Sequence, residues 1–212
     1  MQVGGEPAFA KIPGSGLEFV VNTNWPLFRD DAYLQACTAT VLRVAPEGVR
    51  LDRTVFYPLG GGQAGDAGVL VLADGTQISV ADTRKGKDAE GKPTSDIVHV
   101  PAPGQEATLA ALQPGAQVTA RIDWARRHRL MRFHTTTHLL CHLVPQLVNG
   151  CSITPDYARL DFNMTDPLDK DALTAGIARH VAAALPVTTR WISDAELDAN
   201  PQLVRSMSVQ PP

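Results

Sequence analysis

Two histidines four residues apart are the side chains in this sequence best placed to do chemistry. His134 and His138 flank the run Thr135-Thr136-Thr137, inside a stretch with helical character. Side chains at this spacing lie on one helix face, one turn apart, so two imidazoles can converge on one metal ion such as zinc. The other interpretation is a packed or hydrogen-bonded face that binds no metal.

The pair supplies only part of a zinc site, because zinc in proteins takes three ligands plus water, or four. No Glu stands between the two histidines, so the protease motif His-Glu-x-x-His is absent. Cys141 lies seven residues beyond His134, an axial rise of about 10 Å, which is too far for both to reach one ion. Any third ligand must come from another segment.

A glycine-rich segment, Gly60-Gly61-Gly62-Gln63-Ala64-Gly65, has the spacing Gly-x-Gly-x-x-Gly. A dinucleotide-binding loop requires a helix to begin there, but a Val- and Leu-rich strand follows instead. This context excludes nucleotide binding. Two interpretations stay open: a turn whose glycines take positive φ, or a loop whose bare backbone approaches a ligand.

Four arginines precede the histidine pair: Arg126, Arg127, Arg129 and Arg132. Such a cluster can neutralise nucleic-acid phosphates, or it can be a solvated helix face with ion pairs. The net charge of −3 and the pI near 6.0 give no general attraction to nucleic acid, so any contact must be local.

The elements that carry these residues predict an α+β fold. Short β-branched segments separated by turns indicate a small antiparallel barrel. The expected strands are Thr38–Val44, Val49–Tyr57, Gly68–Leu72, Gln77–Ala81, Ile97–Val100 and Gln117–Ile122, and the polar run over residues 83–92 is expected to be a hairpin tip or mobile loop. A long helix follows from Trp124 to Val144, capped by Asp123.

Beyond that helix we expect a strand at Ala158–Met164, a helix from Leu168 to about Leu185 and a strand at Val187–Ile192. A capping box, Ser193-Asp194-Ala195-Glu196, opens a last short helix. The expected domains are a flexible leader (1–24), a barrel (25–123) and an α/β domain (124–212). No apolar run is long enough to cross a membrane, and three scattered cysteines fit free thiols in the cytoplasm.

Taken together, four motifs resemble the alanyl-tRNA editing proteins, which are free-standing relatives of the editing domain of alanyl-tRNA synthetase. The motifs, in order, are Leu51-Asp52-Arg53-Thr54-Val55-Phe56-Tyr57-Pro58-Leu59 continuing into the glycine-rich segment, Asp123-Trp124 with Arg126-Arg127, His134–Leu140, and Arg159-Leu160-Asp161-Phe162. The resemblance covers roughly residues 28–210. It implies a translation-factor-like barrel followed by an editing domain shared with threonyl-tRNA synthetase.

The resemblance also implies a zinc-dependent hydrolase that removes serine or glycine from misacylated tRNA(Ala). It makes His134 and His138 metal ligands, and Gly60, Gly61, Gly62 and Gln63 a border of the substrate pocket. The arginine cluster becomes a tRNA contact. A buried polar group must read the serine hydroxyl, and the candidates are Thr136, Asn149, Ser152 and Thr154. Which group activates the water stays open, and we expect a monomer or weak dimer.

One family feature is missing from the sequence. The resemblance implies two further zinc ligands from a Cys-x-x-x-His motif, but no Cys or His follows His180. We therefore expect a C-terminally incomplete editing domain that holds zinc weakly, unless Cys151 or His180 substitutes. The alternatives are a tRNA-binding module without catalysis, a fragment of a larger alanyl-tRNA synthetase-like protein, or a purely structural metal site.

Overall fold

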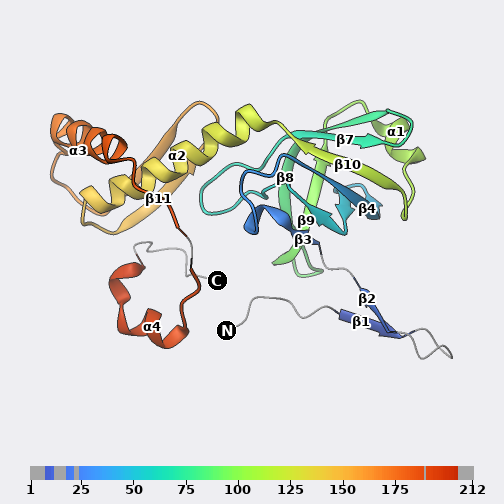
Figure 1. The fold of residues 1–212 in the computed structure, drawn as a ribbon, viewed down its shortest axis with the longest axis horizontal. Helices are drawn as coiled ribbons and strands as arrows, with labels where there is room; N and C mark the ends of the chain where they lie inside the picture. The colour runs from blue at the N-terminus through green and yellow to red at the C-terminus, as the bar shows by residue number, and fades with distance from the viewer. Residues whose placement is uncertain (1–7, 12–17, 22–23, 189, 205–212) are drawn as a thin grey trace. The chain divides into compact units, whose positions relative to one another are not determined.

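The β-branched segments in the first part of the chain close into a barrel of six antiparallel strands, ordered β10–β4–β5–β9–β8–β7 (Figure 1). The computed structural model describes residues 8–11, 18–21, 24–188 and 190–204. The mixture of helices with a large antiparallel sheet is compatible with the predicted α+β class. The barrel strands are β4 (Ala36–Ala45), β5 (Gly48–Leu51), β7 (Gly68–Leu72), β8 (Gln77–Lys87), β9 (Pro93–Pro101) and β10 (Gln117–Ile122).

The other elements are shorter or lie later in the chain. The remaining strands are β1 (Ala8–Lys11), β2 (Glu18–Val21), β3 (Trp25–Pro26), β6 (Arg53–Thr54), β11 (Val148–Ile153) and β12 (Ala158–Phe162). The helices are α1 (Glu106–Ala111), α2 (Trp124–Leu143), α3 (Lys170–Ala183) and α4 (Asp194–Ala199), with single 3-10 turns at Leu27–Arg29 and Pro201–Leu203. β1 and β2 pair with each other, and residues 1–7, 12–17 and 22–23 of the predicted leader lie outside the described residues.

Alternating burial explains why these segments form a barrel. In β10 every second residue, Val118, Ala120 and Ile122, is buried, and the residues between them are exposed. A period of two places one row of side chains inside and the other in solvent. The inward rows of β4, β5, β7, β8 and β10 meet in one core, whose largest fully buried side chains include Phe56 and Leu51.

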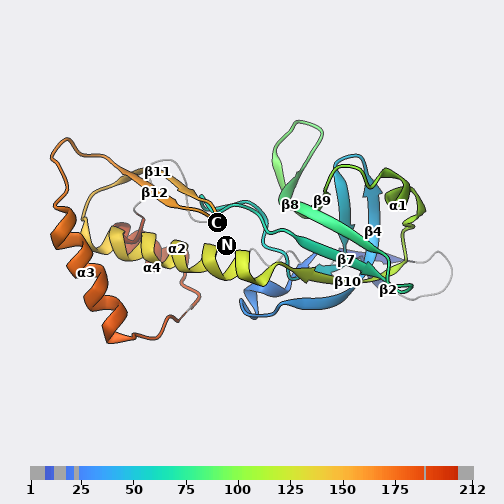
Figure 2. The ribbon, with the colours of Figure 1, turned by 90° about the horizontal axis from the view of Figure 1, so that it is seen from above.

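Several expected strands differ in extent from those observed. The predicted strand Val49–Tyr57 is interrupted at Asp52, whose carboxylate accepts a hydrogen bond from the Thr40 backbone N–H at 2.7 Å. The predicted loop over residues 83–92 is mostly strand, because β8 and β9 pair almost to the tip and form the long hairpin visible in Figure 2. Only the tip at Asp88–Lys92 turns, closed by the Asp88 carboxylate.

One expected strand is absent from the described residues, and two observed elements were not expected. The segment Val187–Ile192 contains no strand among its described residues, and Trp191 is 88% exposed there without a partner strand. Helix α1 and strand β11 were not expected. β11 carries Asn149 and Gly150, residues that are depleted in strands, and it exists because it pairs with β12.

The chain divides into two compact units between His128 and Arg129, inside helix α2. We call Gly4–His128 the barrel unit and Arg129–Pro212 the helical unit. Asp123 caps α2 as predicted, because its carboxylate accepts the Arg126 N–H at 3.0 Å. In the helical unit, Gly176 of α3 packs so closely on Leu143 of α2 that a Cβ would come within 2.8 Å of a leucine methyl. No helix in the described part of the chain could span a bilayer.

A histidine is fully buried in the barrel core, where a charge would be costly. One ring nitrogen of His99, Nδ1, lies 2.9 Å from the Val49 carbonyl oxygen, and the other lies 2.7 Å from the Thr54 hydroxyl. The Thr54 oxygen also accepts the Phe56 N–H, so its hydroxyl hydrogen is free to point at the ring. These contacts fit a neutral imidazole, and burial lowers the pKa of His99 from 6.5 to about 4.

We expect His99 to make the barrel less stable in acid. The unfolded chain binds a proton on this imidazole near pH 6.5 and the folded chain only near pH 4. The free energy of unfolding should therefore be fully retained above pH 6.5 and fall by about 3 kcal/mol between pH 6.5 and 4. Denaturant unfolding at several pH values measures this loss. The variant His99→Gln should lose most of that pH dependence, and identical pH profiles for both proteins would contradict the assignment.

Candidate functional site

The histidine pair is held together as its spacing predicts. His134 and His138 stand one turn apart on α2, with ring centroids 5.1 Å apart and planes inclined by only 11°. Helix α2 is continuous through this region. The Thr137 hydroxyl, between the two histidines, donates a hydrogen bond to the His134 backbone carbonyl at 2.7 Å. The two rings therefore form one face that can present two nitrogens to a common partner.

The two imidazoles have different surroundings. His134 is half-buried and His138 is exposed. Burial, and secondarily the neighbouring His138, lowers the pKa of His134 below its ordinary value of 6.5. An imidazole with a lowered pKa is neutral at pH 7, and a neutral ring keeps the lone pair that a metal ion or a proton requires.

The His pair fits two positions of a metal site, and the described residues do not complete it. They contain no group of three or more His, Cys, Asp or Glu side chains placed to hold one ion. The substitute ligands considered from the sequence have other neighbours. His180 packs edge-on against His142 with ring centroids 5.4 Å apart. Burial, then the proximity of Cys141 and Asp161, raises the pKa of the Cys151 thiol, which opposes thiolate ligation at neutral pH.

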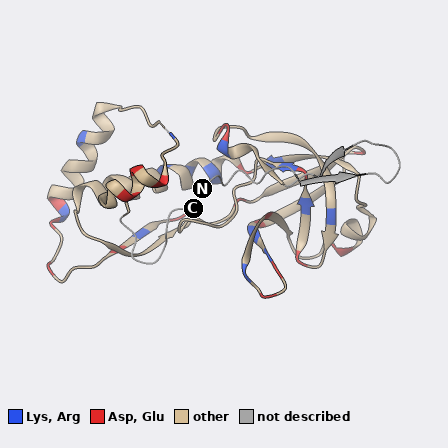
Figure 3. Cartoon of the chain, turned by 90° about the horizontal axis from the view of Figure 1, so that it is seen from below, with Lys and Arg blue, Asp and Glu red and all other residues tan. Residues whose placement is uncertain are grey.

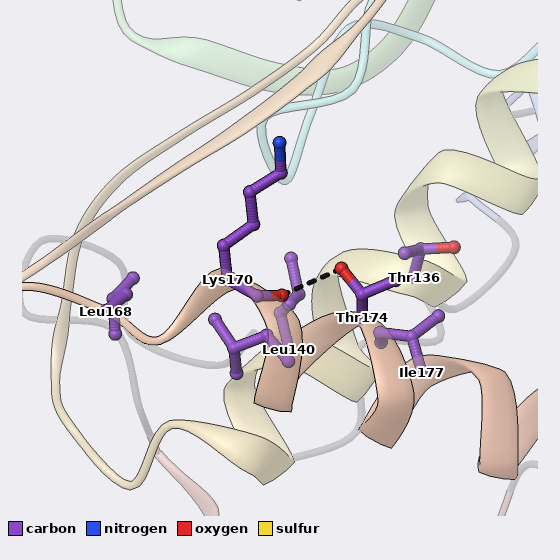
Figure 4. Close-up of a pocket in the computed structure, with 7 residues that line it drawn as sticks. Thr136, Leu140, Leu168, Lys170, Thr174 and Ile177 are labelled. Atoms are coloured by element: carbon purple, nitrogen blue, oxygen red, sulfur yellow. Dashed lines mark hydrogen bonds between the residues drawn. The ribbon is translucent and has the colours of Figure 1, made fainter.

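Thr136 lines a cavity of about 450 Å³ between α2 and α3 (Figure 4). The cavity is mostly apolar, with Leu140, Leu173 and Ile177 in its wall and Lys170 at its edge. Thr136 is two residues from each histidine of the pair, which places it about 200° away around the helix. Its hydroxyl donates to the Arg132 carbonyl at 2.9 Å. Thr136 therefore faces α3, on the side of α2 opposite the imidazoles.

The other hydroxyl-reading candidates lie on or after β11. The Thr154 hydroxyl closes the turn before β12: it donates to the Tyr157 carbonyl and accepts the Tyr157 and Asp156 N–H groups. Ser152 is half-buried in β11, opposite Arg159 of β12, and Asn149 is exposed. Figure 1 and Figure 2 both show the β11–β12 hairpin beside α2.

The glycine-rich segment forms a tight turn in the barrel unit. Gly60 and Gln63 exchange two backbone hydrogen bonds of 3.0 and 3.1 Å, and Gly61 and Gly62 between them have φ of 58° and 79°. Two successive positive φ angles define a type I′ turn, which glycine adopts without strain. The prediction of positive φ is thus confirmed at these two glycines. Both are exposed, whereas the Gln63 side chain is buried.

Close packing explains the glycine that ends this segment. A Cβ at Gly65 would lie 2.1 Å from the Thr83 carbonyl oxygen. That contact allows no side chain, so the backbone here must be bare for β8 to pass it.

Arg127 is buried and belongs to the core of the barrel unit. Only 2% of its surface is exposed, and its Nε donates to both carboxylate oxygens of Asp66, at 3.0 and 2.8 Å. Its Nη2 donates to Asp66 again and to the Val55 carbonyl. Every face of this guanidinium that could meet a phosphate is occupied by protein, so Arg127 cannot take the predicted role in tRNA contact as it stands.

The other three arginines are more open to solvent. Arg126 is half-buried and donates to the Gly65 carbonyl at 2.9 Å, whereas Arg129 and Arg132 are exposed. Neither Arg129 nor Arg132 forms an ion pair with any residue in the described part of the chain. Basic and acidic residues mix over the strands of the barrel, including the β8–β9 hairpin (Figure 3). Arg129 and Arg132 are therefore the members of the cluster available to an anion.

The sequence did not single out the residues that hold the glycine-rich turn in place. The Tyr57 hydroxyl donates to the Gly60 carbonyl at 3.2 Å, and the Tyr57 N–H donates to the Asp66 carboxylate at 2.8 Å. Burial raises the pKa of Tyr57 above 10, so the hydroxyl keeps its hydrogen. Tyr57 lies three residues before the glycine-rich segment and Asp66 directly follows its last glycine, but no spacing rule marks a partner for either.

Comparison with known proteins gives relatives for most of the chain. No protein-family model matches it. An "Alanyl-tRNA editing protein AlaX-M" of Saccharolobus solfataricus is 35% identical over 151 residues, 69% of this chain and 58% of that protein. Its counterpart in Methanosarcina mazei is 38% identical over 141 residues, 63% of this chain and 53% of that protein. An "Alanine--tRNA ligase" of Ignicoccus hospitalis is 38% identical over 151 residues, 68% of this chain but only 15% of the ligase.

The chain therefore spans somewhat more than half the length of these editing proteins and a small part of the ligase. Matches at this identity, over some 140 to 150 residues, bear out the resemblance carried by the four motifs. The chain is a homologue of the alanyl-tRNA editing proteins and of a segment of alanine–tRNA ligases.

Proposed function

We propose that this chain edits misacylated tRNA(Ala) by hydrolysing the ester that joins serine or glycine to the tRNA. The observation that carries the proposal is the parallel pair of imidazoles, 5.1 Å apart on α2, in a chain homologous to alanyl-tRNA editing proteins. In this proposal the barrel unit is the translation-factor-like domain and the helical unit is the editing domain. The proposed reaction takes place in the cytoplasm, where aminoacylated tRNA is used.

Hydrolysis of this ester needs little from the protein. An aminoacyl ester is already activated, so an oriented water and stabilisation of charge on the carbonyl oxygen suffice. We propose zinc as the cofactor, with His134 and His138 as two of its ligands. When bound, zinc polarises a carbonyl or lowers the pKa of a water. The lowered pKa of His134 keeps that imidazole neutral and able to ligate at pH 7.

The remaining site residues have separate parts in the proposal. Gly61 and Gly62 leave the exposed turn without side chains, which allows the terminal adenosine or the amino acid to approach the backbone closely. Discrimination against alanine requires a polar group that is left unpaired when the serine hydroxyl is missing. Of the candidates, Ser152 is half-buried on β11, which lies beside the helix of the His pair, whereas Thr136 faces α3.

Replacing one imidazole tests the hydrolytic part of the proposal. In His134→Ala the rate of serine release from seryl-tRNA(Ala) should fall at least about 100-fold, the range seen when a key group that stabilises charge is removed. The release of radiolabelled serine from seryl-tRNA(Ala) measures the rate. The zinc content of each protein should be measured in parallel. His142→Ala is the matched control, since His142 is an exposed histidine of the same helix that lies outside the pair.

Equal rates for wild type and His134→Ala would overturn the hydrolytic proposal. Zinc lost from His134→Ala without any change in rate would instead assign the pair to a structural metal. The absence of zinc from both proteins would overturn the proposal that zinc is the cofactor.

A tRNA-binding module without catalysis is the second candidate. The exposed Arg129 and Arg132 favour it, because phosphate binding requires no metal site. This candidate predicts salt-dependent tRNA binding by a chain that leaves the ester intact.

The salt dependence of tRNA binding tests the arginine contact in either case. If Arg129 and Arg132 each neutralise one phosphate, the double variant Arg129→Gln/Arg132→Gln should lower the slope of log K against log salt by roughly 1.5. Fluorescence anisotropy of labelled tRNA between low and physiological salt gives this slope. Arg179→Gln, an exposed arginine of α3, should leave it unchanged. An unchanged slope in the double variant would remove both arginines from the interface.

A further inference from the structure

The helices α2 and α3 touch at Gly176 and leave a cavity beside that contact. A Cβ at Gly176 would come within 2.8 Å of the Leu143 side chain, so the helices are tightly packed there. Towards the start of α3 they border the cavity of about 450 Å³ (Figure 4). Cavities that bind small molecules measure roughly 300–1,000 Å³. The space therefore has the size of a small-molecule site, and its lining belongs to the helical unit alone.

One face of α3 forms a wall of this cavity. Four lining residues recur there at spacings of three and four residues, which places them on one helix face. They are Lys170, Leu173, Thr174 and Ile177. An apolar helix face normally packs against a neighbour. Here Leu173 and Ile177, like Leu140 across the cavity on α2, are only half-buried, so a ligand would remove their remaining surface from water.

The two hydroxyl groups in the wall are already paired. The Thr136 hydroxyl donates to the Arg132 carbonyl at 2.9 Å, and the Thr174 hydroxyl donates to the Lys170 carbonyl at 2.8 Å, as the dashed line in Figure 4 shows. Both hydrogens are thus used within their own helices. A polar group placed deep in the cavity would lose its water without gaining these donors, and this loss is costly. The body of any ligand here must therefore be apolar.

Lys170 supplies the only charge among the described residues that line the cavity. Its ammonium forms no ion pair within the part of the chain that the structure describes, and it stands apart from the other lining side chains (Figure 4). The neighbouring Asp169 carboxylate caps α3, accepting the N–H groups of Asp171 and Ala172 at 3.0 and 2.9 Å. Asp171 is exposed and is not a lining residue. The edge of the cavity thus favours an anionic group.

We propose that the cavity binds an amphiphile with an anionic head, of the class of medium-chain carboxylates. Its alkyl chain lies between Leu140, Leu173 and Ile177, and its carboxylate lies at the edge, beside the Lys170 ammonium. Thr136 lines this cavity on the side of α2 opposite the imidazoles. Binding here therefore needs neither a metal ion nor tRNA, and it goes beyond the proposed hydrolysis.

A chain-length series tests the apolar part of the site. Calorimetric titration of the full chain with octanoate and decanoate, each below its micelle concentration, gives the two dissociation constants. Each buried methylene tightens binding by a factor of about four, so decanoate should bind roughly 15-fold more tightly than octanoate. Leu173→Trp fills the cavity and should weaken decanoate binding at least about ten-fold. Leu140→Phe fills it from α2 and takes the place of the first variant if the indole prevents folding.

The neutral alcohol of the same length isolates the contribution of the charge. In Lys170→Gln, decanoate should bind about three-fold more weakly, the size of a solvent-exposed ion pair, whereas decanol should bind as it does to wild type. Arg179→Gln is the matched control, because Arg179 is an exposed cation of α3 that does not line the cavity. This control should bind both ligands as wild type does.

Three outcomes of these titrations would overturn the inference. They are undetectable binding of decanoate, equal binding by wild type and the filled variants, and an equal loss of decanoate and decanol in Lys170→Gln. Sedimentation of the unliganded chain tests a second copy as the occupant. A wild-type dimer that Leu173→Trp dissociates would assign the cavity to that contact and would also overturn the inference. None of these measurements uses serine release, so the proposed function is tested separately.

Discussion

The buried ion pair of Asp66 with Arg127 is the interaction on which the arrangement of the barrel unit depends. It joins the first turn of α2 to the segment that follows the glycine-rich turn, across 61 residues of sequence. Withdrawing two charges from water is costly, and the cost is offset here by hydrogen bonds to both oxygens, to the Val55 carbonyl and from the Tyr57 N–H. Removing one partner of such a pair costs about 3–5 kcal/mol, because the other charge is left buried. The pair therefore specifies where α2 begins on the barrel more than it adds net stability.

Regular periodicity was enough to predict much of the fold. Strands β7 and β10 have the predicted bounds, and α2 ends one residue before the expected Val144, because capping and alternation are local properties. The predictions failed where contacts with residues distant in the sequence determine the local structure. Asp52 breaks a β-rich run because its carboxylate is used by Thr40, and the polar β8–β9 hairpin stays extended because each strand satisfies the other's backbone. Val187–Ile192 has strand composition but no neighbouring strand among the described residues.

In the candidate site, too, the features set by local sequence could be predicted and those set by distant partners could not. A spacing of four residues is sufficient to bring His134 and His138 together, since a helix needs no tertiary information to do so. The role of Arg127 could not be predicted, because a cation beside other cations suggests a surface until its carboxylate partner is found elsewhere in the chain. Thr136, a candidate from the sequence for reading the serine hydroxyl, lines the cavity beside α3, and helical rotation places it on the side of α2 opposite the imidazoles.

The exposed segment after α3 has a practical consequence for observing the molecule. Trp191 is 88% exposed in the helical unit, while Trp25 and Trp124 belong to the barrel unit, and these three are all the tryptophans of the chain. An indole in water emits at longer wavelength than one shielded by protein. With phenylalanine in place of the two barrel tryptophans, the emission maximum would report only on the solvent around residue 191. The chain thus contains an intrinsic optical reporter for whatever comes to cover that segment.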